Sequence, residues 1–495
     1  MRRVPLLSGS RIVVVPAGDE DVVLRPPPPP PRVADTGAAV RDALRFPLFG
    51  PPLSAIVPQG GRVTILVEPP ELPLPGTPQD PRRDALAATI SELEQCGVPD
   101  ERQTIIVAGG LGRRLGQREL ERLLQPPQAR AFRGRVLVHD AEDPGLVQIS
   151  DAARINPVLV ETDAVIVVTA AETVVNGGPG TLLSACDAAT VRAATAGTSL
   201  LEAATSGGWS LALGLEAALA QKTALMGVSL VLDLPRLTGT LRGYPHEIAT
   251  VDRVARSPLR AIFSRLPAFA RRDILVSRGR RVAATAAFAG PPSIAHAEAL
   301  LRGVELRGTR LDGPLDALVV GTPWIGPHVP REPVNPVTAA AVALGLALRL
   351  HRNEFPIRHD GTLIVCHPLT RVFAHGTQAP YAAMFNALHG SHDPAELVAV
   401  EQAAAADSKA LSAYRAAKAC HPLLPYADWA ACAPSLARLG RVVVAGCRDA
   451  IAARALGFVP SHSIASALEM AHGIAGGRAR VGILLAPPYP PLLVG

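Results

Sequence analysis

The stretch DAVIVVTAAETVVNGGPGTLL, residues 163–183, joins a run of apolar, mostly β-branched residues to a glycine-rich turn. Apolar residues that follow one another without alternation are typical of a strand covered on both faces. Gly177, Gly178 and Gly180 then allow the chain to turn sharply. Because α/β proteins bind ligands beyond the carboxyl ends of their strands, the stretch predicts a central strand and a candidate ligand-binding turn.

Similar short apolar runs recur along the whole chain, and the segments between them have helical spacing. Leu86, Ile90 and Leu93 share one helical face, for example, and Gly97 follows as a stop signal. The alternation predicts an α/β fold built on parallel or mixed sheets. The further predicted strands are residues 11–15, 61–67, 103–108, 135–140, 226–233, 315–321, 362–367, 441–446 and 480–486.

The length of 495 residues allows two or three domains with sizeable cores. Six consecutive prolines at 26–31 predict an extended connector. An arginine-rich segment separates the two sets of predicted strands. We therefore predict an N-terminal α/β domain over residues 1–254, a connecting or inserted segment over 255–310, and a C-terminal α/β domain over 311–495.

Composition and charge restrict the expected partners and compartment. Lys and Arg number 49 against 43 Asp and Glu, for a net charge of +6, but the densest basic stretch, 271–281, contains no aromatic residue for stacking on bases. The chain has no signal-peptide core and no long uncharged apolar stretch, and its six cysteines form no Cys-x-x-Cys motif. We expect a cytoplasmic protein that binds neither nucleic acid nor membranes.

Two glycine-rich turns are candidates for ligand binding. Arginines that open a helix behind glycines, as after strand 103–108, can hold a phosphate or carboxylate, although the glycines are equally explained by a tight turn. The turn after strand 163–168 lacks the lysine of a phosphate loop but keeps a threonine that could hydrogen-bond a phosphate. The predicted ligand-binding residues are Gly109, Gly110, Arg113, Arg114, Gly177, Gly178, Gly180 and Thr181.

Histidines gather after the predicted strand 362–367. His367, His375, His389 and His392 lie within 26 residues, but their spacing matches no compact metal-binding motif. Solvated or core histidines are the better explanation, and we predict no metal site from the spacing.

Several segments occur in the order of a known family. VAGGLGRRLGQREL (107–120) is similar to an Ala-Thr-Gly-x-His-Arg turn with its helix, and AETVVNGGPGTLLSACD (171–187) falls on a histidine-containing Gly-Gly-x-Lys turn. VEPPELPLP (67–75) takes the place of an acidic–basic turn, and residues 459–494 resemble a closing helix and strand. In this order, nearly end to end, the chain resembles the nickel-dependent lactate racemases and their relatives.

The resemblance implies two α/β domains with a cleft between them. In active family members the cleft holds a nickel-pincer nucleotide, a pyridinium-derived mononucleotide tethered to a lysine through a thioamide. One histidine coordinates the nickel, and two further histidines act as alternate acid and base. This division of roles fits racemisation, which needs proton acceptors on both faces of the substrate.

The chain departs from the family pattern at each of these positions. The two acid–base histidines fall on Gly112 and near Ala171, the tethering lysine near Thr181, and the nickel-ligand histidine near Gly197. The cofactor is therefore unknown from the sequence, since the resemblance implies the nickel-pincer nucleotide but the residues that would hold it are absent.

Two functions follow as alternatives. The first is a divergent lactate racemase-like protein that binds a small anionic ligand in the interdomain cleft without nickel-pincer chemistry. The second is a 2-hydroxy-acid racemase or epimerase, an isomerase with a rebuilt site whose dependence on nickel is left open, for which His139, His367 and His375 are the catalytic candidates. The sequence leaves both the activity and the oligomeric state undecided.

Overall fold

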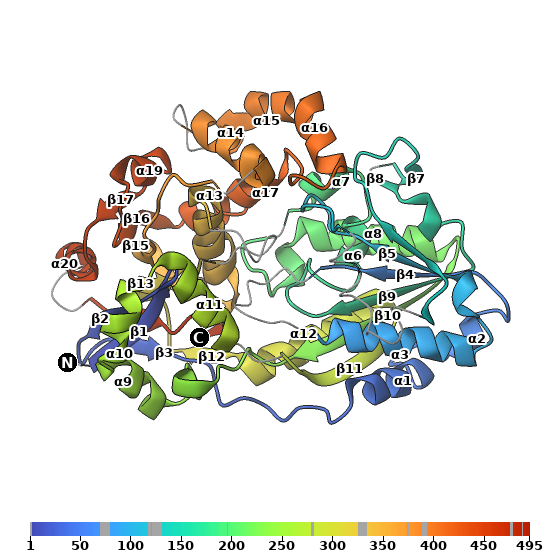
Figure 1. Ribbon diagram of the computed structural model, residues 1–495, viewed down its shortest axis with the longest axis horizontal. Coiled ribbons are helices and arrows are strands. Elements are labelled where there is room, and N and C mark those ends of the chain that lie inside the picture. The colour runs from blue at the N-terminus through green and yellow to red at the C-terminus, as the bar shows by residue number, and fades with distance from the viewer. Residues whose placement is uncertain are drawn as a thin grey trace.

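The computed structural model describes residues 2–69, 80–116, 120, 131–151, 153–195, 197–278, 282–324, 334–373, 376–388, 394–475, 479–487 and 489–495. It contains two six-stranded sheets, each flanked by helices (Figure 1). The predicted α/β fold with parallel and mixed sheets is confirmed.

The first sheet contains the apolar run of residues 164–170 as one of its central strands. Its strand order is β11-β10-β9-β4-β5-β6, with every pair parallel except the edge pair of β10 and β11. The strands are β4 (Val63–Val67), β5 (Gln103–Val107), β6 (Arg135–Val138), β9 (Ala164–Ala170), β10 (Ala224–Leu232) and β11 (Ala284–Gly290).

Both faces of this sheet are covered, which explains the unbroken apolar run of β9. Ile166 and Val168 belong to the same core cluster as residues of α1 (Thr36–Arg45) and α3 (Arg82–Gln95). Val165 and Val167 face the other side, in a cluster with residues of α8 (Gly207–Ala220) and α6 (Gly180–Leu183). A strand enclosed in this way has no polar face to alternate with an apolar one.

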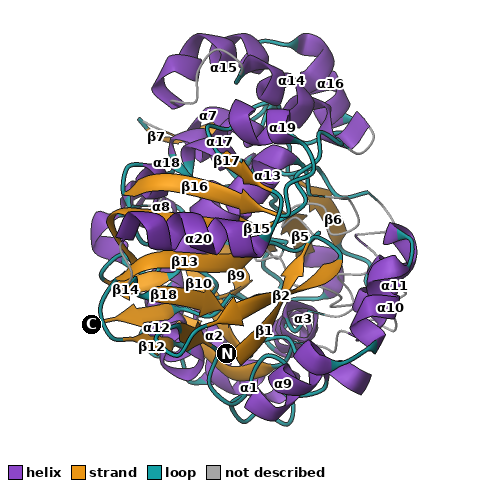
Figure 2. Cartoon of the chain, turned by 90° about the vertical axis from the view of Figure 1, so that its left-hand side faces the viewer, coloured by secondary structure: helices purple, strands orange, loops and turns teal. Residues whose placement is uncertain are grey.

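The second sheet is parallel throughout, in the order β17-β16-β15-β13-β18-β3. The helix α20 (Ile464–Ala475) packs across β13, β15 and β16 (Figure 2). The strands are β3 (Val22–Leu24), β13 (Leu315–Gly321), β15 (Ile357–Cys366), β16 (Leu439–Ala445), β17 (Val459–Ser461) and β18 (Val481–Leu484).

Each sheet includes or contacts segments that lie outside the domain predicted for it. The N-terminal strand β3 joins the second sheet, and the hairpin of β1 (Arg2–Ser8) and β2 (Arg11–Ala17) shares a core cluster with β13 and β15. Conversely, two elements of the predicted connecting segment belong with the first sheet: β11 is its edge strand, and α12 (Pro292–Arg307) packs on β10 and β11. The predicted domain limits stay a prediction.

The remaining elements surround these sheets, and among the described residues no helix is long and apolar enough to cross a membrane. The strands are β7 (Val147–Ser150), β8 (Ala153–Ile155), β12 (Thr309–Leu311), β14 (His351–Asn353) and β19 (Leu492–Val494). The helices are α2 (Leu53–Ile56), α7 (Ala188–Ala193), α9 (Ile248–Arg256), α10 (Leu259–Arg265), α11 (Ala268–Arg278), α13 (Pro336–Ala340), α14 (Ala379–Ala387), α15 (Val398–Ala405), α16 (Ser408–Arg415), α17 (Leu424–Ala430), α18 (Ala433–Leu436) and α19 (Ala450–Ala455).

Candidate functional site

Three buried carboxylates line the carboxyl edge of the first sheet. Glu68 follows β4, Glu172 lies just beyond β9, and Asp233 follows β10. Because β10, β9 and β4 are adjacent and parallel, the three side chains meet at the edge where α/β sheets bind ligands. A carboxylate is costly to bury without a positive partner, so each one needs a compensating group nearby.

Arg82, the first residue of α3, compensates two of these carboxylates. Its guanidinium is 3% exposed and lies 3.0 Å from a carboxylate oxygen of Glu172 and 3.0 Å from one of Asp80. Burial by itself lowers the pKa of Arg82, but Asp80, Glu172 and Glu68 outweigh it and hold that pKa above its ordinary value. We call these four residues the Arg82 cluster.

Asp233 forms a second buried ion pair at the same edge. Its carboxylate is fully enclosed, 2.8 Å from Nη2 of Arg32 and 3.4 Å from Nε of Arg236, and it accepts the backbone N–H of Ala283. Arg307 lies near Glu172 of the Arg82 cluster and near Asp233. Burial lowers the pKa of Arg307, while these two carboxylates oppose that shift. The edge is therefore charged but internally neutralised.

The glycines after β9 are required by packing against α12. A Cβ at Gly178 would lie 2.3 Å from Cβ of His296, and one at Gly177 would lie 2.6 Å from its Cε1. The N–H of Gly178 donates to Oγ1 of Thr169, and that of Gly180 donates to the carbonyl of Gly177. These N–H groups are thus used within the protein and do not point to a ligand.

His296 fixes this turn from a distant part of the chain. Its Nε2 donates to the carbonyl oxygen of Thr173, 2.8 Å away and 123 residues earlier, and its ring stacks on Trp209. Complete burial lowers the pKa of His296 to about 4, so the ring is neutral. It therefore acts as a structural donor.

Thr181 lies inside the protein. Its side chain is fully buried in the short helix α6, and its N–H donates to the carbonyl of Gly178. Among the described residues its hydroxyl finds no hydrogen-bond partner. The position is enclosed by protein.

The histidine candidates hold separate structural positions. At His139, Nε2 donates to the carbonyl of Cys186 (2.8 Å) and Nδ1 accepts from Asn156 (3.2 Å), while burial lowers the pKa. At His367, after β15 of the second sheet, Nδ1 accepts the N–H of Leu369, and burial lowers the pKa to about 4.

Within the described ranges these two histidines share no hydrogen-bond partner, and no group of three or more His, Cys, Asp and Glu residues could hold a metal ion. The third candidate, His375, lies outside the described residues, as do His389 and His392.

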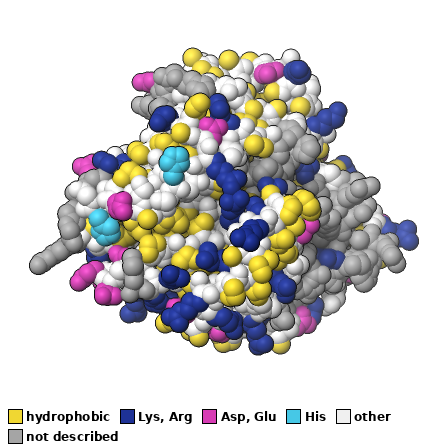
Figure 3. Space-filling model, turned by 60° about the vertical axis from the view of Figure 1, so that its left-hand side comes forward, with side chains coloured by type: hydrophobic (Ala, Val, Ile, Leu, Met, Phe, Trp, Pro, Cys, Tyr) yellow, Lys and Arg dark blue, Asp and Glu magenta, His cyan; other side chains and the backbone are white. Residues whose placement is uncertain are grey.

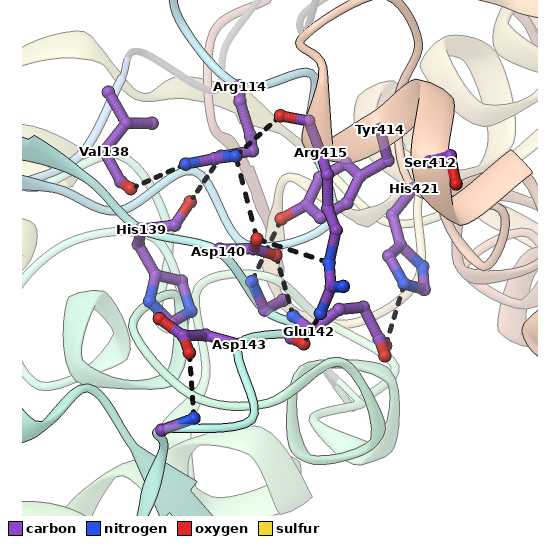
Figure 4. Close-up of polar contacts among 12 residues, drawn as sticks. Arg114, Val138, His139, Asp140, Glu142, Asp143, Ser412, Tyr414, Arg415 and His421 are labelled. Atoms are coloured by element: carbon purple, nitrogen blue, oxygen red, sulfur yellow. Dashed lines mark hydrogen bonds and ion pairs between the residues drawn. The ribbon is translucent and has the colours of Figure 1, made fainter. Parts of the chain in front are cut away.

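The glycine turn after β5 connects the first sheet to the C-terminal part of the chain. Arg114 donates to the carbonyl oxygens of Val138 and His139 beside β6 and to that of Arg415 at the end of α16 (Figure 4). Its guanidinium also lies 3.7 Å from Asp140. Arg114 therefore joins two backbone segments and is not free to hold an anion.

Further contacts strengthen this connection, which we call the Arg114 bridge and define as Arg114, Asp140, Glu142, Tyr414, Arg415 and His421. The hydroxyl of Tyr414 donates to the carbonyl of Gly110 (3.3 Å) and accepts the N–H of Ala141 (3.2 Å). The ring of His421 accepts the N–H of Leu423 at Nδ1, so its Nε2 carries the proton and donates to Glu142 (3.1 Å). Arg415 lies 3.5 Å from Asp140.

The remaining predicted ligand residues of this turn make contacts with backbone groups of the protein. Gly110 has a φ of +51°, and its N–H donates to the carbonyl of Ser184. Gly109 accepts the N–H of Gly112 at 2.8 Å. Arg113 reaches the carbonyl oxygens of Arg114 and Ala417 at 3.3 and 3.5 Å. The turn thus serves the contact between the two parts of the chain.

A groove of about 500 Å³ opens at the carboxyl edge, between the N-terminal ends of α1 and α3. Arg32 and Ala283, which both contact Asp233, place it beside the end of β10. Its polar lining consists mainly of Arg32, Asp35, Thr36, Arg41, Asp84 and Ser91.

Reasoning from the sequence missed Arg82, Asp233 and His296. A carboxylate directly after an apolar strand was a usable signal for Asp233, as it was for Glu68. Arg82 gave no signal, because an arginine in the first turn of a helix is ordinarily solvated. His296 lies too far along the chain for any local pattern to join it to the turn.

Comparisons with known proteins give a match by sequence and matches by structure. Residues 9–177 match the model of the lactate racemase N-terminal domain family. The structure of the lactate racemase apoprotein from Thermoanaerobacterium thermosaccharolyticum has a TM-score of 0.62 at 14% identity, covering 100% of both chains. A protein from Thermotoga maritima has a TM-score of 0.49 at 11% identity, covering 94% of this chain and 100% of the other. A search of curated protein sequences finds no match.

The fold is that of an α/β protein with two sheets of mainly parallel strands, and its residues 9–177 are similar to the lactate racemase N-terminal domain. The chain is lactate racemase-like, by sequence over that domain and by fold over its whole length. The resemblance inferred from the order of the segments is confirmed.

Replacing Arg82 by Met should strongly destabilise the protein. The substitution leaves Glu68, Asp80 and Glu172 without their shared cation, and removing one partner of a buried pair costs about 3–5 kcal/mol. Urea unfolding should report this loss, whereas Arg302→Met, at an exposed pair with Glu305, should change little. Equal stability of the two variants would show that the cluster contributes nothing.

Stability should fall as the pH is lowered from about 6.5 to about 4. Buried His296 and His367 stay neutral in the folded protein, because their pKa values are lowered to about 4, while unfolded histidines protonate near pH 6.5. The unfolded state binds more protons in this window, so each residue removes up to about 3 kcal/mol. Urea titrations from pH 7.5 to 4.5 measure this, and His296→Gln should make the pH dependence shallower. A free energy of unfolding that is constant over this range would contradict the prediction.

Proposed function

We propose that this chain is a lactate racemase-like protein that binds a small anionic ligand and does not carry out nickel-pincer racemisation. One observation carries the proposal. The positions that correspond to the family's two acid–base histidines and its tethering lysine hold packed residues without imidazole or amine groups. Of the histidines in this part of the fold, His139 has both ring nitrogens in hydrogen bonds inside the core, and the fully buried His296 donates from Nε2 to the carbonyl oxygen of Thr173.

The residues at the family's functional positions do not fit the nickel-pincer nucleotide. Thr181 has no amine to form a thioamide and is fully buried. Ala171 is also fully buried. At Gly197 even a Cβ would lie 2.3 Å from Oγ1 of Thr205, so an imidazole at this point would require the loop to move. We therefore derive no reaction step through this group.

The groove between α1 and α3 is the place that we propose for the ligand. The N-terminal ends of both helices carry partial positive charge, which favours an anion. The guanidinium of Arg41 is 34% exposed and only loosely paired with Asp35, at 4.0 Å, so it can turn toward a ligand carboxylate. Asp35 and Asp84 can accept hydrogen bonds from ligand hydroxyl groups. This combination suits a small hydroxylated carboxylate bound beside the first sheet, whereas the resemblance placed the ligand between the domains.

Coexpression with the enzymes that synthesise the nickel-pincer nucleotide tests the catalytic part of the proposal. We expect the intact mass of the unmodified polypeptide, no bound nickel, and no exchange of solvent deuterium into D- or L-lactate. A covalent nickel adduct together with exchange would overturn the proposal and establish the alternative, a 2-hydroxy-acid racemase with a rebuilt site.

Calorimetric titration tests the binding part. Wild-type protein should bind at least one member of a series of 2-hydroxy acids, and Arg41→Ala should weaken that affinity about tenfold, as expected for the loss of one charge-assisted hydrogen bond. Arg302→Ala, at an exposed position of α12, is the matched control and should bind as wild type does. Indifference of the wild-type protein to the whole series would refute anion binding.

A further inference from the structure

The helices α10 and α11 expose bulky apolar side chains to solvent. Leu259 is 56% exposed, Ile262 59% and Phe269 68%. Pro258, Ala261, Pro267 and Ala268 are also exposed, so the apolar character is continuous along the connection between the two helices. We call residues 258–269, together with their flanking arginines, the basic apolar surface.

The inner side of the two helices is anchored, which leaves their outer side free. Helix α10 packs against β2, and in α11 Leu275 packs against Trp324. The guanidinium of Arg272 lies over the ring of Trp324 at 5.2 Å, and Arg271 donates to Oγ of Ser10. The exposed apolar residues therefore lie on an element with a fixed orientation.

Positive charge surrounds these apolar side chains. From Ile248 to Arg278 the chain carries seven arginines and two aspartates, 7 − 2 = +5, and Asp252 already lies 3.7 Å from Arg2. Arg260 follows Leu259 directly, and Arg265 lies three residues beyond Ile262. On the face seen in Figure 3, arginine side chains lie among hydrophobic ones.

We propose that the basic apolar surface docks onto an anionic lipid bilayer. Apolar side chains on short amphipathic helices enter the boundary between headgroups and acyl chains, while arginines extend to the lipid phosphates. The core of a protein–protein interface is instead depleted in charge, whereas here Leu259 and Ile262 both lie within two positions of Arg260. The proposal replaces the expectation from the sequence that the protein has no membrane partner, and it is independent of the ligand groove.

Sedimentation of the full chain with lipid vesicles tests this. We expect binding to phosphatidylcholine vesicles that contain phosphatidylglycerol, weak binding to pure phosphatidylcholine, and release at high salt. The triple variant Leu259→Ser/Ile262→Ser/Phe269→Ser should lower the partition coefficient by more than about tenfold. Arg260→Gln/Arg265→Gln should lower it roughly 30-fold, since two surface charges are removed.

The matched control is Val398→Ser/Val400→Ser in α15. These apolar residues are 49% and 40% exposed and have no neighbouring arginine in their helix, so vesicle binding should be unchanged. All the substituted apolar side chains are exposed, and circular dichroism should confirm that each variant folds. Three outcomes would overturn the proposal: no binding by the wild-type protein, equal loss in the control, or self-association that the triple variant abolishes in the absence of vesicles.

Discussion

The burial of Arg82 among Glu68, Asp80 and Glu172 is the constraint on which the carboxyl edge of the first sheet depends. A guanidinium that is 3% exposed has almost no water to solvate it, so it depends on the negative charge of the carboxylates around it. Those carboxylates come from the end of β4, the turn after β9 and the residues before α3. One cation therefore holds the ends of two neighbouring strands and the start of a helix in a fixed relation.

The turn after β9 shows how a motif typical of ligand binding can serve packing instead. Gly177 and Gly178 leave space for His296 on α12. The N–H groups of Gly178 and Gly180 donate to Thr169 and Gly177, within the protein. The backbone shape expected beside a ligand is thus kept by contacts within the protein. This supports our proposal that binding takes place in the adjacent groove, where an arginine remains exposed.

The Arg114 bridge shows that arginines typical of an anion site can also serve a contact within the protein. Two arginines behind a glycine turn satisfy every local rule for an anion site, yet Arg114 donates to three backbone carbonyls from two distant parts of the chain. Planar guanidinium groups suit this task because their donors are held in a fixed fork. These carbonyl acceptors cannot be identified from the sequence, because they come together only when the fold places the end of α16 near the end of β6 (Figure 4).

The sequence by itself determined most strands of the two six-stranded sheets, the class of fold and the resemblance to lactate racemase, because hydrophobic periodicity and the order of turns are local properties of the chain. Only the tertiary structure decided that Glu68 and Glu172 are buried against Arg82, that His139 and His367 are core residues of different sheets, and that His296 holds the glycine turn. Burial and hydrogen bonding set the pKa and availability of each group, and both depend on residues that are far apart in the sequence.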